Sequence, residues 1–237
     1  MLTEANHWIA IIGTAADAIL LCRVLQLKLQ RVYLFITLGC LLALFFDGVD
    51  LWLANDQNDN LRVFLYSRFL YAVVFPLIAW DVFEEMKSQI SNLRRIATRK
   101  LISGIFFAAV FGFMLTAFGF TGDNSEPPIL ATLGLVLWAG SSTASLAFVW
   151  TLRRAIRLQN ISRPSNTVVW MTFWQLVLLA QVLSCFYFLL APSLPNWTAD
   201  ILGITLNSYG IVITAWCILR LRALPSDVPS APANANL

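Results

Sequence analysis

The chain alternates between long apolar stretches and short polar gaps. Seven stretches hold the roughly 20 mostly apolar residues that a helix needs to cross the hydrocarbon layer of a membrane. A helix also satisfies its own backbone N–H and C=O groups in lipid. We therefore predict an all-α integral membrane protein, a seven-transmembrane-helix bundle, with spans near 6–27, 32–54, 62–84, 101–121, 129–151, 168–190 and 199–221.

Basic residues occupy every second gap between these stretches. The first, third and fifth gaps and the segment after the seventh stretch hold fourteen of the sixteen Lys and Arg. These are Arg23, Lys28, Arg31, Lys87, Arg94, Arg95, Arg99, Lys100, Arg153, Arg154, Arg157, Arg163, Arg220 and Arg222. The remaining gaps are acidic or neutral. Because cytoplasmic loops collect Lys and Arg, we expect the N-terminus outside and the C-terminus in the cytoplasm.

The pattern divides the chain into two regions. Residues 1–223 are predicted to form the seven-helix transmembrane domain, and residues 224–237, rich in Pro, Ala and Asn, a disordered cytoplasmic tail. The first stretch lacks a basic segment before it and carries Asp17 at its centre, so we expect a retained helix and not a cleaved signal peptide. The expected location is the cell (inner) membrane.

Composition supports the membrane assignment. The chain is 59% apolar and 12% charged, whereas a soluble domain is about 25% charged. Its mean hydropathy is +0.72. The net charge of +3 comes from residues at helix ends and forms no interleaved basic patch, so we expect a lipid bilayer as partner and no nucleic acid.

Several chemistries are disfavoured by residues that the chain lacks. A retinal Schiff base needs a Lys inside the bundle, but Lys28, Lys87 and Lys100 all lie near predicted helix ends. His7 is the only histidine, which excludes bis-histidine haem ligation and a multi-histidine zinc site. Phe46-Asp47-Gly48 resembles the opening of the motif of membrane phosphoalcohol transferases, but the rest of that motif does not follow. We expect no cofactor and favour no enzymatic activity.

A few polar residues lie within the predicted spans. A charge at the bilayer centre costs about 2.5–3.5 kcal/mol even on the lenient insertion scale, so such residues normally face the bundle interior. The candidate ligand-binding cluster consists of Asp17, Asp47, Asp50, Arg68, Gln181 and Asn207. Asp47 and Asp50 share a helix face, and Arg68 lies at a similar depth on the next helix. The alternatives are a structural clamp and an outward-opening polar cavity, rimmed by Tyr66, Tyr71 and Tyr209.

Three acids lie at the other end of the third stretch. Asp81, Glu84 and Glu85 are expected to reach the membrane interface or to pair with basic residues of the loops. The structural interpretation is favoured for all three.

Three classes of function fit these features. The first is a sensor or interaction protein that perceives an outer or lipid-soluble ligand and acts through membrane or cytoplasmic protein partners. The second is a small-solute or lipid transporter that uses the polar cavity, and the third is a structural subunit of a larger membrane complex. The topology resembles seven-helix receptors and the membrane regions of bacterial sensor kinases, but this likeness concerns architecture alone.

Overall fold

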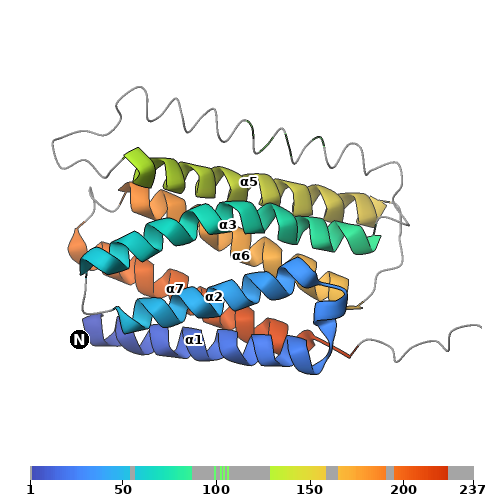
Figure 1. The fold of residues 1–237 in the computed structure, drawn as a ribbon, viewed down its shortest axis with the longest axis horizontal. Helices are drawn as coiled ribbons and strands as arrows, with labels where there is room; N and C mark the ends of the chain where they lie inside the picture. The colour runs from blue at the N-terminus through green and yellow to red at the C-terminus, as the bar shows by residue number, and fades with distance from the viewer. Residues whose placement is uncertain are drawn as a thin grey trace, which may run out of the picture.

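A bundle of long helices that lie side by side forms the protein, as the computed structural model shows in Figure 1. The structure describes residues 2–53, 57–86, 129–158, 165–190 and 195–223, together with the single positions 99, 102, 104 and 106. The helices are α1 (Leu2–Gln26), α2 (Leu34–Trp52), α3 (Gln57–Met86), α5 (Ile129–Leu158), α6 (Ser165–Leu190) and α7 (Asn196–Arg220). A short 3-10 helix, η1 (Leu29–Arg31), joins α1 to α2.

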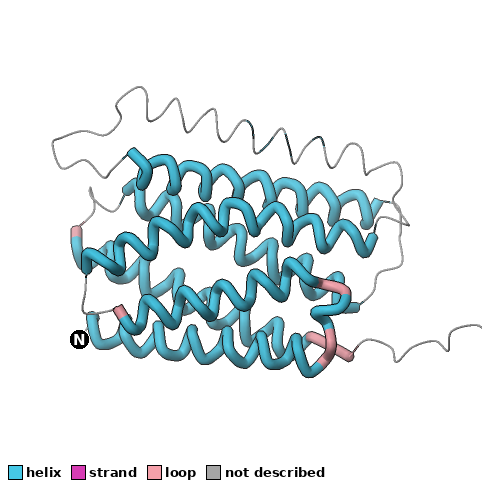
Figure 2. The backbone as a smooth tube through the Cα atoms, in the orientation of Figure 1, coloured by secondary structure: helices cyan, strands magenta, loops and turns pink. Residues whose placement is uncertain are grey.

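Six of these helices are long and apolar enough to cross a membrane, which identifies a helical membrane protein. The candidate spans are His7–Gln26, Leu34–Trp52, Tyr66–Glu84, Leu133–Leu158, Asn166–Cys185 and Ile201–Arg220. They agree with six of the seven predicted stretches, and the described residues contain no strand (Figure 2). The predicted fourth span, 101–121, lies outside the described part of the chain apart from three single positions.

Two helix ends differ from the prediction. The third helix begins at Gln57, about one turn before the predicted residue 62. The fifth continues to Leu158, so Arg153, Arg154 and Arg157 lie on its last two turns and not in a loop. Polar residues near a helix end can stay helical at the headgroup level, because the backbone hydrogen bonds continue regardless of the side chains.

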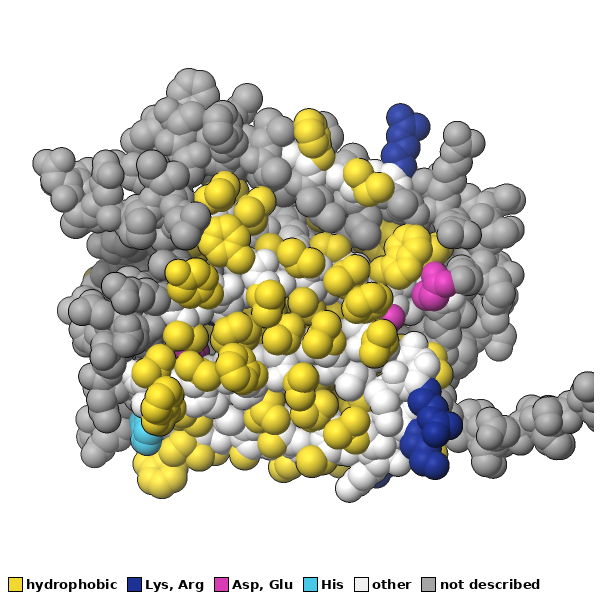
Figure 3. All heavy atoms as spheres, in the orientation of Figure 1, with side chains coloured by type: hydrophobic (Ala, Val, Ile, Leu, Met, Phe, Trp, Pro, Cys, Tyr) yellow, Lys and Arg dark blue, Asp and Glu magenta, His cyan; other side chains and the backbone are white. Residues whose placement is uncertain are grey.

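The described helices close into a ring. Each of α1, α2, α3, α5, α6 and α7 packs against the next, α7 packs against α1, and α3 also touches α6. Basic side chains gather at one end of the ring, here called the basic end, which includes Arg23, Lys28, Arg31 and Arg220. The end that carries the N-terminus is called the opposite end. Figure 3 shows Lys and Arg at the basic end and apolar side chains over the middle of the visible face.

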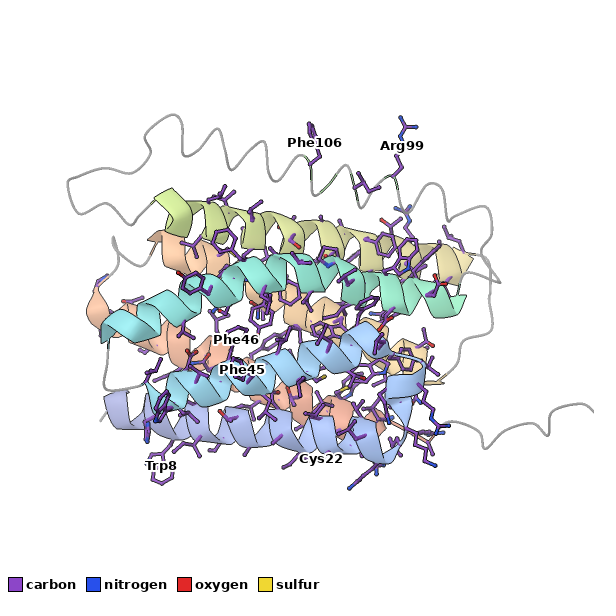
Figure 4. The ribbon with its side chains drawn as sticks, viewed as in Figure 1. Trp8, Cys22, Phe45, Phe46, Arg99 and Phe106 are labelled. Carbon is purple, nitrogen blue, oxygen red and sulfur yellow. The ribbon has the colours of Figure 1, made fainter. Side chains whose placement is uncertain are left out.

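The packed core lies mainly in the half of the bundle next to the basic end. The buried apolar residues of α1 begin at Leu20, those of α2 end at Cys40 and those of α7 begin at Ile213. By contrast, α3, α5 and α6 remain buried farther toward the opposite end, at Ser67, Trp138 and Cys185. The outward side of α1 carries exposed Trp8 and Cys22 (Figure 4). The half near the opposite end therefore has fewer tightly packed residues on α1, α2 and α7.

Candidate functional site

The candidate acids and Arg68 meet where α2 faces α3. Asp47 and Asp50 lie on α2 and Arg68 lies on α3, and both carboxyl groups interact electrostatically with the guanidinium of Arg68. The two helices are packed neighbours that run in opposite directions. The structure thus brings together the three residues that the sequence placed at matching depth.

Asp17 extends this group to two further helices. Its carboxyl group makes side-chain hydrogen bonds with Asp47 of α2 and Thr214 of α7. Two ionised carboxylates are both acceptors, so a hydrogen bond between them requires a proton on one of the two groups. We define the polar cluster as Asp17, Asp47, Asp50, Arg68 and Thr214.

Aromatic rings surround the guanidinium of Arg68. Its Cζ atom lies 4.2 Å from the centroid of the Trp138 ring and 5.9 Å from that of Tyr71. Both distances lie within the range of cation–π attraction, which is worth about 2 kcal/mol when the groups are desolvated. Trp138 on α5 is 1% exposed, so this face of the guanidinium is covered by a buried indole.

The polar cluster has more carboxyl groups than cations. The cluster contains three carboxyl groups and one guanidinium, and Asp50 Oδ1 is buried without a hydrogen-bond partner among the residues that the structure describes. One proton between Asp17 and Asp47 offsets part of this excess. The chemistry of the cluster therefore suits a group that donates hydrogen bonds or carries positive charge.

The described contacts do not join the other two predicted members to the polar cluster. Asn207 is exposed on α7, and Gln181 is partly buried on α6, so the described contacts of the polar cluster include neither. The register of α1 against α7 explains why Thr214, and not Asn207, is the α7 residue of the polar cluster. Gly13 faces Ile211, and Asp17 therefore lies level with Thr214 and not with Asn207, which is two turns earlier on α7.

Sequence reasoning missed Thr214 and Trp138. A single Thr or Trp in an apolar helix carries no charge signal, and each was indistinguishable from an ordinary packing residue. Of the three tyrosines expected at a cavity rim, Tyr71 lies beside Arg68, whereas Tyr66 is 64% exposed. The register of the helices would have been needed to select Thr214 and Trp138.

A column of aromatic rings leads from the polar cluster to the basic end. Tyr71 stacks on Phe75 with ring centroids 5.4 Å apart, and Phe75 contacts Trp174 at 6.3 Å. The contacts continue through Phe173 and Trp170 to Tyr33. We call these six residues, Tyr71, Phe75, Trp174, Phe173, Trp170 and Tyr33, the aromatic column. It crosses from α3 to α6 and ends just before α2.

Hydrogen bonds tie the helices together at the basic end. The hydroxyl groups of Tyr33 and Thr167 are 3.2 Å apart. Asn166 of α6 donates to the carbonyl of Arg222 at 2.8 Å and accepts from its N–H at 2.9 Å. Arg23 of α1 donates to the carbonyl of Leu221 at 3.5 Å. The chain after α7 is therefore held between α1 and α6.

The expectation for Asp81 was wrong. This residue is 8% exposed, and its Oδ2 accepts hydrogen bonds from the backbone N–H groups of Phe35 and Ile36. It turns inward because the first N–H groups of α2 need acceptors that the helix itself does not provide. The structural role is thus a helix cap and not contact with the membrane interface. Glu85 lies outside the side chains that the structure describes.

Comparison of the chain with protein-family models, with curated proteins and with solved structures gives no match. Within the described residues, no group of three or more His, Cys, Asp or Glu is placed to hold a metal ion.

Proposed function

We propose that the protein is a seven-helix membrane sensor that receives a ligand at the polar cluster and acts through protein partners at the basic end. The observation that carries this proposal is the aromatic column. It supplies continuous ring contacts between the helices that hold Arg68 and the helices tied together at the basic end.

The composition of the polar cluster suggests the class of ligand. The excess of carboxyl groups over Arg68 favours a small molecule with an amine or several hydrogen-bond donors. Such a ligand can donate hydrogen bonds to Asp47 in place of the proton that the Asp17–Asp47 pair requires, and can reach Asp50 Oδ1. Fewer buried residues on the same half of α1, α2 and α7 support access from the opposite end.

The proposal includes the complete topology expected from the charge pattern. Seven spans would place the opposite end outside the cell and the basic end in the cytoplasm. Variants with one cysteine added at position 5 or at position 223, in a background without the exposed Cys22, test this orientation with a membrane-impermeant thiol reagent. Labelling of intact cells at position 5 but not at 223 is expected, and the reverse result contradicts the proposed orientation.

Coupling between the polar cluster and the basic end can be measured without knowing the ligand. Asp47→Asn changes the polar cluster, and hydrogen–deuterium exchange of residues 27–33 and 220–223 reports on the basic end. We expect Asp47→Asn to change exchange there in the wild-type background. In a Phe75→Leu background, where the column is interrupted, the change should be much smaller.

A matched control separates this coupling from general loosening. Trp8→Leu also removes an aromatic ring, but Trp8 is 64% exposed and lies outside the column. The response to Asp47→Asn should persist in this background. A response that persists equally in Phe75→Leu would contradict a role of the column in coupling.

Partner capture and transport assays distinguish the sensor from a transporter. Tagged protein, cross-linked in native membranes, should retain a specific partner whose yield changes with Asp47→Asn. Proteoliposomes that contain only the purified protein should not accumulate small amines such as radiolabelled methylamine. Accumulation that depends on Asp47 would instead show a transporter.

A further inference from the structure

Four exposed basic residues lie on two short segments at one corner of the basic end. Lys28 precedes η1 and Arg31 is its last residue, whereas Arg220 is the last residue of α7 and Arg222 follows it. Arg23 of α1 bonds to the carbonyl of Leu221, so the two segments belong to neighbouring helices. We call Lys28, Arg31, Arg220 and Arg222 the basic corner.

A buried leucine fixes each segment of the basic corner. Leu29 is 0% exposed between Lys28 and Arg31, and Leu221 is 2% exposed between Arg220 and Arg222. Asn166 also binds both backbone groups of Arg222. The backbone that carries these four side chains is therefore held in place before any ligand arrives, which lowers the entropy lost on binding.

No acid on the same stretches neutralises the basic corner. The sequence contains no Asp or Glu between residues 18 and 46 or between residues 201 and 226. Asp81, an acid at the same end of α3, is buried and engaged with the start of α2. The positive charge of the corner is thus available to an external anion.

Exposed apolar residues stand directly beside these bases. Leu219 is 83% exposed next to Arg220, and Leu25 and Leu34 are 46% and 64% exposed on either side of η1. Lipid acyl chains cover such residues and place phosphates at the level of the bases. The combination matches a membrane interface.

We propose that the basic corner binds the phosphate group of an anionic phospholipid. Two anchored segments present guanidinium and ammonium groups to the headgroup while the adjacent leucines contact its acyl chains. This inference is independent of the ligand proposed for the polar cluster, because it uses different residues at the other end of the bundle.

Lipid-dependent stability of the full chain tests the proposal. Purified protein in a non-ionic detergent is titrated with phosphatidylglycerol or phosphatidylcholine, and thermal unfolding is followed by the reactivity of the buried Cys40, Cys185 and Cys217 in a Cys22→Ser background. Phosphatidylglycerol should raise the unfolding temperature and phosphatidylcholine should not. The effect should weaken as salt increases.

Two charge-matched pairs of substitutions localise the effect. Arg220→Gln with Arg222→Gln should lower the apparent affinity for phosphatidylglycerol about fivefold per residue. Arg154→Gln with Arg157→Gln removes two exposed bases from α5 at the same end and should have little effect. If the first pair fails to fold, Lys28→Gln with Arg31→Gln takes its place.

Three results would overturn the proposal. Equal losses in both pairs would show attraction to the whole basic end and not to the corner. Equal stabilisation by inorganic phosphate would show a site for a soluble anion. Equal stabilisation by polyglutamate would show a site for an acidic protein.

Discussion

The carboxylate of Asp81 accepts a 2.6 Å hydrogen bond from the backbone N–H of Phe35. The same oxygen accepts the N–H of Ile36 at 3.0 Å. These are the second and third residues of α2, whose own N-cap, Tyr33, provides no side-chain acceptor. Asp81 of α3 therefore performs from another helix the role that an Asp at the N-cap position usually performs.

Replacement of Asp81 should destabilise the bundle. Asp81→Ala leaves two N–H groups at the start of α2 without this acceptor, so we expect a loss of about 1–3 kcal/mol in the free energy of unfolding. Asp81→Asn keeps a carbonyl acceptor of the same size and should lose less. Thermal or denaturant unfolding in detergent measures both, and equal stability of Asp81→Ala and wild type would refute the capping role.

Asn166 should protect the chain after α7 from proteolysis. Its amide group binds the N–H and the C=O of Arg222. This C=O belongs to the peptide bond after Arg222, which trypsin cleaves. Asn166→Ala should therefore accelerate tryptic cleavage after Arg222. Asn166→Asp keeps an acceptor for the N–H but loses the donor, so cleavage at an intermediate rate is expected. Mass spectrometry of the released peptide gives both rates.

Hydropathy and charge were sufficient to predict the helical membrane architecture but not the complete site. Long apolar stretches identify spans because lipid imposes helices on them, and the meeting of Asp47, Asp50 and Arg68 followed from the short connection between two antiparallel helices. The partner of Asp17 could not be predicted in this way. It depends on the register of α1 against α7, two helices far apart in sequence. A shift of two turns along α7 makes Thr214, and not Asn207, the neighbour of Asp17.

The hydrogen bond between Asp17 and Asp47 predicts different effects for two substitutions. Asp17→Asn supplies an amide donor to Asp47 and an acceptor for Thr214, so its stability should stay within about 1 kcal/mol of wild type. Asp17→Ala removes both contacts and should cost about 1–3 kcal/mol. The free energy of unfolding in detergent distinguishes them. Equal losses in the two variants would show that the position requires an acid and not merely a hydrogen bond.

Two glycines of α2 should respond in opposite ways to substitution by alanine. A Cβ atom at Gly39 would lie 2.6 Å from Cδ1 of Ile78, whereas nothing lies within 4 Å of one at Gly48. Ile78 is 1% exposed, so it has little room to move. Gly39→Ala should cost about 1–3 kcal/mol through overpacking, and Gly48→Ala should gain about 0.5–1 kcal/mol from better helix propensity.

A second substitution tests the cause of the effect at Gly39. Ile78→Val removes the Cδ1 atom and by itself should cost about 0.5–1.5 kcal/mol. If the contact with Ile78 causes the loss, Gly39→Ala combined with Ile78→Val should be more stable than the sum of the single effects predicts. Additive losses would instead place the strain elsewhere, with Trp174 Cη2 the next nearest side chain at 3.6 Å. The close approach of α2 to α3, on which the positions of Asp47 and Arg68 depend, would then need a different explanation.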